Sequence, residues 1–164
     1  MRPTNGSTVP RPRVVLKPQA FGALRAAAGA SRTSERGGIL VGYRHGLDVV
    51  VEDALTVPDP RANRTTYVRR PQPAADVLAT YLRRADPLVG YVGEWHTHPE
   101  PQPPSGVDHQ AMRLMTLRNQ DSTALVVAAL KPDGSVELHG VLSVPDAWTH
   151  DLASRHLEAT VTVE

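Results

Sequence analysis

The segment Leu88–Pro99, LVGYVGEWHTHP, is the part of the chain that most strongly indicates its fold and its site. Its residues Leu88 to Trp95 predict a strand that carries a His-Thr-His triplet at its end, where Pro99 stops it. Because residues i and i+2 of a strand point to the same face, His96 and His98 can present two imidazoles to one ion. The segment therefore predicts a pair of metal ligands at a strand end, where a cleft can open.

A second group of polar residues follows after the proline-rich loop Pro99–Pro104. Ser105 and Asp108 have the spacing of a capping box, with Asp in place of the usual Glu, and predict a helix through about Leu117. A carboxylate in the first helical turn is also favoured by the helix dipole. Two imidazoles and one carboxylate leave a fourth position for water, as in a catalytic zinc site. Taken alone, Asp108 is better explained as a helix cap than as a metal ligand.

A candidate general base lies upstream, in the stretch SERGGILVG at residues 34–42. A metal-activated water needs a nearby base to accept its proton, and Glu35 directly precedes two glycines and a predicted buried strand at Ile39–Tyr43. The alternative is a surface glutamate in a turn. Glu94 is the next candidate for the base.

The remaining pattern alternates helices with strands and contains a hairpin near the C-terminus. Residues 1–13 are expected to be a flexible leader, and residues 14–164 a single domain. The alternation with a terminal hairpin favours an α/β (α+β) fold, a mixed β-sheet flanked by helices, over a doubly wound parallel sheet. The further predicted helices are 19–28 after Pro18, 74–84 and 147–157, and the further strands are 14–16, 47–55, 65–69, 123–130 and 136–142.

Composition excludes several classes of function. The 164 residues, 40% apolar and 21% charged, fit one soluble domain, and the net charge of +1 gives no electrostatic footprint of a nucleic-acid binder. The chain has no cysteine, so a thiol nucleophile, a disulfide and thiolate metal ligands are excluded. No secretory h-region and no apolar run of transmembrane length is present, so a cytoplasmic location is expected.

Together these segments resemble the JAMM (MPN-plus, JAB) metalloprotease family. The family pattern is a Glu near a Gly-Gly-x-Leu-x-Gly strand, then His-Ser/Thr-His-Pro, then Ser-x-x-Asp. Here it corresponds to Glu35 with residues 37–42, to residues 96–99, and to residues 105–108. The order matches, and the resemblance covers about residues 14–142. The loop Pro99–Pro104 is one residue shorter than in the familiar pattern.

The resemblance implies an MPN/JAB (cytidine-deaminase-like) domain with a zinc ion. By this analogy His96, His98 and Asp108 bind Zn²⁺, Glu35 is the general acid/base, and Ser105 stabilises the tetrahedral intermediate. Trp95 and the proline-rich loop look most like bacterial JAB proteins, several of which are encoded with ubiquitin-like proteins. We therefore expect hydrolysis after the C-terminal glycine of a ubiquitin-like protein, by deconjugation or precursor processing.

Other functions stay open at this point. One alternative is the same kind of enzyme with a different substrate, a peptidase that acts on a sulfur-carrier protein. Another is a non-catalytic MPN scaffold, which would only bind partners. A nucleic-acid-processing JAB protein is disfavoured by the near-neutral charge. Zinc deaminases need Cys ligands, and a His-x-His amidohydrolase barrel needs a longer chain. The arginines at 61, 64, 69 and 70 either contact the ubiquitin-like partner or belong to a solvated loop.

Overall fold

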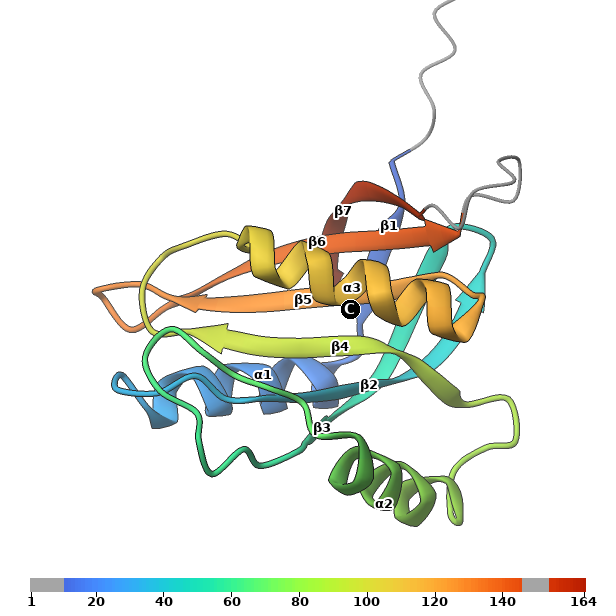
Figure 1. Ribbon diagram of the computed structural model, residues 1–164, viewed down its shortest axis with the longest axis horizontal. Helices are drawn as coiled ribbons and strands as arrows, with labels where there is room; N and C mark the ends of the chain where they lie inside the picture. The colour runs from blue at the N-terminus through green and yellow to red at the C-terminus, as the bar shows by residue number, and fades with distance from the viewer. Residues whose placement is uncertain (1–10, 146–153) are drawn as a thin grey trace, which may run out of the picture.

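The computed structural model describes residues 11–145 and 154–164, which form a closed seven-stranded sheet with three helices (Figure 1). The strand order is β1-β3-β2-β4-β5-β6-β7. The elements are β1 (Arg13–Leu16), α1 (Pro18–Ala30), β2 (Gly37–His45), β3 (Asp48–Thr56), α2 (Pro71–Leu82), β4 (Gly90–His98), α3 (Gly106–Asn119), β5 (Thr123–Leu130), β6 (Val136–Pro145) and β7 (Ser154–Val163). The predicted mixture of helices and sheet is confirmed, but the prediction of a plain sheet flanked by helices is wrong, because the sheet closes into a barrel.

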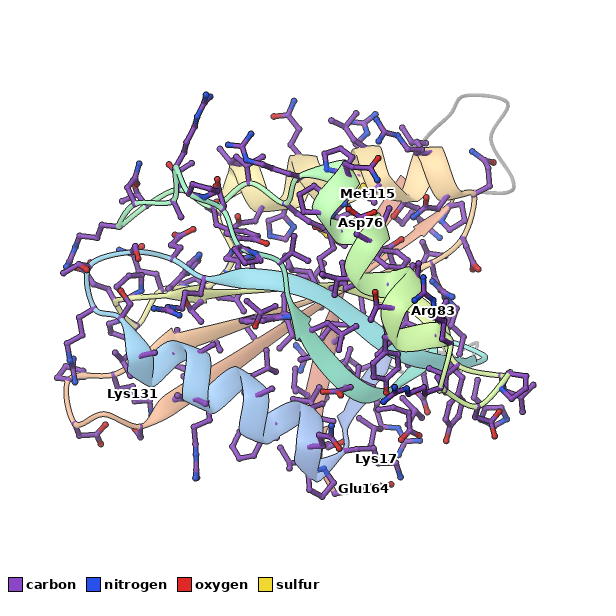
Figure 2. The ribbon with its side chains drawn as sticks, turned by 90° about the horizontal axis from the view of Figure 1, so that it is seen from below. Lys17, Asp76, Arg83, Met115, Lys131 and Glu164 are labelled. Atoms are coloured by element: carbon purple, nitrogen blue, oxygen red, sulfur yellow. The ribbon has the colours of Figure 1, made fainter. Side chains whose placement is uncertain are left out.

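Closure depends on the short strand β1, which pairs in parallel with β3 on one side and β7 on the other. The Glu164 N–H donates to the Leu16 carbonyl at 3.0 Å, and Lys17 forms an ion pair with the Glu164 side chain where the two segments meet (Figure 2). The predicted helix at 147–157 is wrong for residues 154–157, which belong to β7; residues 146–153 lie outside the described part of the chain.

The other predicted elements are mostly confirmed, with small changes at their ends. The strand at Thr123–Leu130 has the predicted bounds, while α2 begins three residues earlier than predicted, at Pro71, because proline suits the first helical position. The predicted short strand Thr65–Arg69 is absent. Side-chain bonds hold that segment instead: the Tyr67 hydroxyl donates to the Val57 carbonyl at 2.7 Å.

Each helix covers a different part of the barrel wall. α1 buries Ala20, Leu24 and Ala28 among side chains on the inner face of the sheet, including that of Trp95. α2 covers β2 and β3. α3 lies outside β5 and β6, where Met112 packs against Leu125, Val127 and Val141. None of the helices in the described ranges is long and apolar enough to cross a membrane.

The pairing of β4 with β5 places the polar residues of the motif together. The two strands are parallel, with His96 opposite Val127, so the chain must cross over between them, and α3 is that crossover. The first turn of α3 therefore begins close to the end of β4, beside His98 (Figure 1).

Candidate metal and catalytic site

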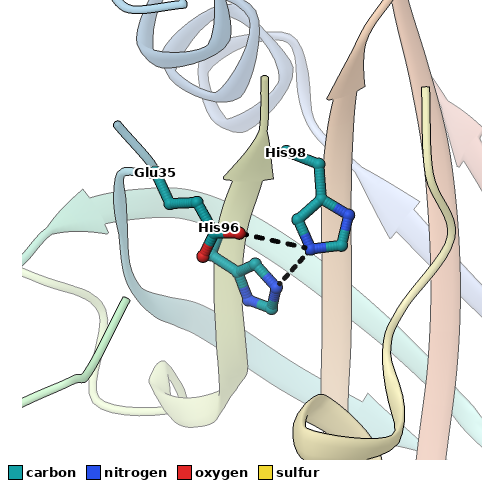
Figure 3. A group of neighbouring side chains, drawn as sticks. All are labelled: Glu35, His96 and His98. Carbon is teal, nitrogen blue, oxygen red and sulfur yellow. Dashed lines mark hydrogen bonds and ion pairs between the residues drawn. The ribbon is translucent and has the colours of Figure 1, made fainter. Parts of the chain in front are cut away.

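The two histidines of β4 face the same point in space. His96 and His98 are 8% and 7% exposed, and their Nε2 atoms lie 3.2 Å apart (Figure 3). Two imidazoles bound to one tetrahedral zinc at 2.0–2.1 Å would have nitrogens about 3.3 Å apart. The pair is therefore already spaced to share one ion. Gly37, opposite His96 in the sheet, leaves room for the Tyr67 ring, because a Cβ there would lie 2.7 Å from both Tyr67 Cδ1 and the Trp95 carbonyl oxygen.

The orientation of the His98 ring is fixed by the loop that follows it. Its Nδ1 lies 2.8 Å from the Gln102 carbonyl oxygen. A carbonyl can only accept, so Nδ1 carries the proton and the lone pair of the neutral ring is on Nε2, toward His96. The short loop Pro99–Pro104 therefore orients one of the two imidazoles toward the point they share.

Asp108 closes the group from the first turn of α3. Its Oδ1 lies 3.3 Å from His96 Nε2, and its Oδ2 lies 3.5 Å from His98 Nε2. Burial alone would raise the pKa of Asp108, but the two histidines and the Ser105 N–H hold that pKa well below its usual range. A carboxylate that stays ionised and contacts both rings has the chemistry of a metal ligand.

Glu35 lies in the segment directly before β2, and its side chain extends toward the two histidines. The side chain is only 7% exposed, and its Oε1 lies 3.8 Å from His98 Nε2. Burial raises the pKa of Glu35, while the positive charge that His96 and His98 can carry opposes the rise. A buried carboxyl with a raised pKa is suited to taking up and releasing a proton.

Either carboxylate could complete a metal site with the two histidines. Glu35, His96 and His98 offer ligand atoms that all lie within 4.8 Å of one another. Asp108, however, contacts both imidazoles at 3.3 and 3.5 Å, whereas Glu35 contacts His98 at 3.8 Å. The distances favour Asp108 as the third ligand and leave Glu35 beside the open position.

Ser105 is the N-cap residue of α3. Its Oγ accepts from the Asp108 N–H at 3.2 Å, and its own N–H donates to Asp108 Oδ2 at 2.6 Å. The predicted capping box with Asp in place of Glu is confirmed. The box also holds the Asp108 carboxylate against the imidazoles, and the Ser105 hydroxyl keeps its own proton to donate outward.

A cleft of about 200 Å³ opens over this group and is lined by Glu35, His98, Ser105 and Asp108, with Arg64 and Thr65 on its far wall. A second hollow of about 310 Å³ continues past Glu35 along the segment from Thr56 to Ala62. Both hollows are lined by residues of the loop that joins β3 to α2, and Glu35 borders both of them.

The arginines of that loop differ in their surroundings. Arg64 is exposed at the cleft, paired with Glu100 and donating to the Arg32 carbonyl at 3.0 Å. Arg69 is largely buried and forms an ion pair with Glu94. The Tyr91 hydroxyl also donates to Glu94, at 3.2 Å. Glu94 therefore holds the loop against β4. Glu35, rather than Glu94, is the glutamate that lies near the imidazoles.

Thr97 is a residue of the site that the sequence did not single out. It is 1% exposed, and its Oγ1 accepts from the Arg36 N–H at 3.0 Å while its N–H donates to the Arg36 carbonyl at 2.7 Å. The Glu35 N–H in turn donates to the Asn63 carbonyl at 2.7 Å. The Thr97 bonds hold the segment of Glu35 and Arg36 against the histidine strand, and the Asn63 bond holds it against the loop that joins β3 to α2. In the sequence, the sign of this role is a hydroxyl residue between two histidines, which strand alternation places on the opposite face of β4 from the two imidazoles.

The comparisons with known proteins bear on the family and the fold of the chain. A family model described as prokaryotic homologs of the JAB domain matches residues 17–143. The solved structure of protein DSY2949 from Desulfitobacterium hafniense superposes with a TM-score of 0.59 over 92% of each chain, at 20% identity, which is a likeness of fold.

Three curated relatives share the name "CD-NTase/cGAS isopeptidase". The Pseudomonas aeruginosa protein is 33% identical over 90 residues, which is 53% of this chain and 56% of the relative. The Escherichia coli protein is 30% identical over 98 residues and the Vibrio cholerae protein 33% over 99, each covering 58% of this chain and 62% of the relative. The matches thus span somewhat over half the length of these relatives.

Metal binding tests the geometry directly. Protein loaded with zinc and dialysed is expected to hold one ion at this site, and the His96→Ala/His98→Ala double variant should hold one ion fewer per chain than the wild type, because the remaining carboxylates cannot replace two imidazoles. Glu94→Gln is the matched control and should retain the ion. Elemental analysis provides the measurement. Undiminished zinc in the double variant would show that the ion binds elsewhere.

Proposed function

Because the chain belongs to the prokaryotic homologs of the JAB domain, we propose that it is a zinc-dependent isopeptidase. In this proposal His96, His98 and Asp108 bind the zinc, Glu35 is the general acid/base, and Ser105 stabilises the tetrahedral intermediate. The substrate is a conjugate in which the carboxyl terminus of one protein is joined to an amine of another. The observation that carries the proposal is the convergence of two imidazole nitrogens 3.2 Å apart on the Asp108 carboxylate, with Glu35 alongside.

Zinc bound at this point would supply a Lewis acid that acidifies water and polarises the scissile carbonyl. The protein's own contribution is to keep the ligands in place without adjustment. The Gln102 carbonyl fixes the tautomer of His98, and the capping box fixes Asp108. Such preorganisation means that little of the substrate's binding energy is needed to assemble the site.

Glu35 handles the protons in the proposed reaction. As a carboxylate it takes a proton from the attacking water, whose oxygen forms a bond to the carbonyl carbon. It then gives that proton to the amine nitrogen as the carbon–nitrogen bond breaks. The raised pKa of Glu35 supports both halves of this cycle, because a carboxyl with its ordinary pKa would hold the proton too weakly to deliver it near neutral pH.

The substrate has to enter as an extended chain. The cleft of about 200 Å³ and the adjoining hollow of about 310 Å³ are too narrow for folded structure. The loop from Val57 to Arg70 borders both of these hollows, so we propose that the tail lies along this loop, with Arg64 at the entrance.

The name of the curated relatives narrows the choice of conjugate. "CD-NTase/cGAS isopeptidase" favours a CD-NTase as one component of the conjugate. A ubiquitin-like protein with a C-terminal glycine is the other candidate for the tail that enters the cleft. A sulfur-carrier protein is the third, and it would be processed by the same chemistry.

The substrate is tested with reporter fusions. CD-NTase, ubiquitin-like and sulfur-carrier tails are each joined through the carboxyl terminus to a fluorescent reporter and incubated with the zinc-loaded protein. We expect cleavage of the CD-NTase or ubiquitin-like fusion, inhibited by chelators and insensitive to thiol reagents, since the chain has no cysteine. Glu35→Gln should bind zinc normally and slow cleavage by at least about 10²-fold, a typical contribution of general acid–base catalysis.

Two outcomes would contradict the proposal. If zinc-loaded protein binds these partners and cuts none of the fusions, the chain is a scaffold rather than an enzyme. If cleavage is seen and Glu35→Gln turns over at the wild-type rate, the base is another residue, and Glu94→Gln becomes the next variant to measure.

Ser105→Ala separates an oxyanion role from capping. Loss of the cap alone should lower the free energy of unfolding by about 1 kcal/mol and leave kcat nearly unchanged. Loss of an oxyanion donor should also lower kcat by about 10²-fold. We expect both effects, with zinc retained, measured by thermal unfolding, turnover and metal analysis. A stability loss without a fall in kcat would reduce Ser105 to a cap.

Thr97 should act through Glu35. Thr97→Val keeps the shape of the side chain but removes the acceptor for the Arg36 N–H, so the Glu35 segment is expected to move relative to His98. The expected result is a fall in kcat with zinc affinity retained, and recovery in Thr97→Ser, which restores the hydroxyl. Equal kcat values in Thr97→Val and the wild type would show that the bond does not position Glu35.

A further inference from the structure

Three histidines gather on the other side of the first turn of α3, away from Glu35. They are His109 of α3, His139 of β6 and His156 of β7, and all three line a cavity of about 400 Å³. Pro103 and Pro104 of the loop before α3 also line this cavity. Three separate elements therefore bring imidazoles to one cavity that the proposed isopeptidase chemistry does not use.

Two of these imidazoles repeat the geometry of the candidate catalytic pair. His109 Nδ1 and His156 Nδ1 lie 3.1 Å apart, and their rings are stacked with centroids 5.2 Å apart. The corresponding distance between His96 Nε2 and His98 Nε2 is 3.2 Å. Both values are near the separation of about 3.3 Å for two nitrogens on one tetrahedral zinc. Without an ion, one ring of each pair has to donate a proton to the other.

The cavity also holds imidazole nitrogens that lack a partner. Among the described residues, neither His139 Nε2 nor His156 Nε2 has a hydrogen-bond partner, and both atoms are buried. A buried polar atom without a partner costs free energy that a ligand can recover. His139 Nε2 lies 3.8 Å from Glu137 Oε1, beyond hydrogen-bonding distance, so no hydrogen bond to Glu137 holds this ring in its present orientation.

We propose that His109 and His156, with His139 as a third ligand after rotation of its side chain, form a second site for a divalent transition metal. Imidazole ligands in a chain without cysteine select ions of the zinc, copper and nickel type. The role of the ion is structural, because one ion would link three separate elements, α3, β6 and β7. The bound ion would tie the first turn of α3 to the barrel wall.

This tie has a consequence for the candidate catalytic site. His109 directly follows Asp108, so an ion that fixes His109 to β7 also restrains the helical turn that carries Asp108. His109 and His156 are 47 residues apart in the chain, and linking them limits local opening at the N-terminus of α3. The second site does not depend on the isopeptidase proposal, since metal binding alone reveals it.

The test is a zinc titration of the metal-free full chain, followed by calorimetry and thermal unfolding. We expect about two zinc ions per chain in the wild type, about one in His156→Gln, and about one in the His96→Ala/His98→Ala variant. His45→Gln changes an exposed histidine and is the matched control, with both ions retained. The second ion should raise the Tm of the wild type and of His45→Gln but not that of His156→Gln.

His109→Gln is a second variant and should give the same loss as His156→Gln, which covers the case in which one substitution impairs folding. Cobalt(II), titrated in place of zinc, should show the absorption of a tetrahedral nitrogen-rich site that disappears in either variant. A wild-type chain that binds only one zinc, and loses it in the His96→Ala/His98→Ala variant, would overturn the proposal. So would a wild type with two ions whose number stays unchanged in His156→Gln and His109→Gln.

Discussion

The parallel pairing of β4 with β5 is the constraint on which the rest of the site depends. Parallel neighbours cannot be joined by a tight turn, so the chain has to leave the end of β4, cross over through α3 and return. The crossover brings the first turn of α3, with Ser105 and Asp108, to the place where His96 and His98 end the strand. Met112, buried against β5 and β6, keeps the helix at that position.

The two carboxylates near the imidazoles illustrate how surroundings divide chemical roles. Asp108 lies in the first turn of a helix, accepts the Ser105 N–H and contacts both imidazoles, which keeps it ionised. Glu35 is buried with fewer partners, and its pKa is raised. The same functional group is thus stabilised as an anion on one side of the histidines and left ready to exchange a proton on the other.

Much of this could be predicted from local sequence. The alternation in β4 places His96 and His98 on one face, and the Ser-x-x-Asp spacing predicts the cap of α3, because both features depend on residues close in the chain. Glu35 is a candidate base from its position before two glycines and a buried strand, and the family resemblance gives it the same role. Its contact with His98 is not visible locally, because it depends on Thr97 and Asn63, which hold the segment through bonds distant in sequence.

The features that were missed depend on long-range pairing. Residues 157–162 alternate more buried and exposed positions, as a strand does, but their partner β1 lies at the other end of the chain and is only four residues long. Closure of the barrel was therefore not visible locally. The stretch Thr65–Arg69 had strand-forming residues but found side-chain partners in Asp59 and Glu94 instead of a neighbouring strand.

Anomalous X-ray diffraction at the zinc edge, from crystals of the zinc-loaded wild-type protein, tests the assignment of the metal ligands while both carboxylates are present. We predict a strong peak within about 2.0–2.2 Å of His96 Nε2, His98 Nε2 and an Asp108 oxygen, with residue 35 outside bonding distance. A peak bonded to His96, His98 and residue 35, with Asp108 turned away, would contradict it.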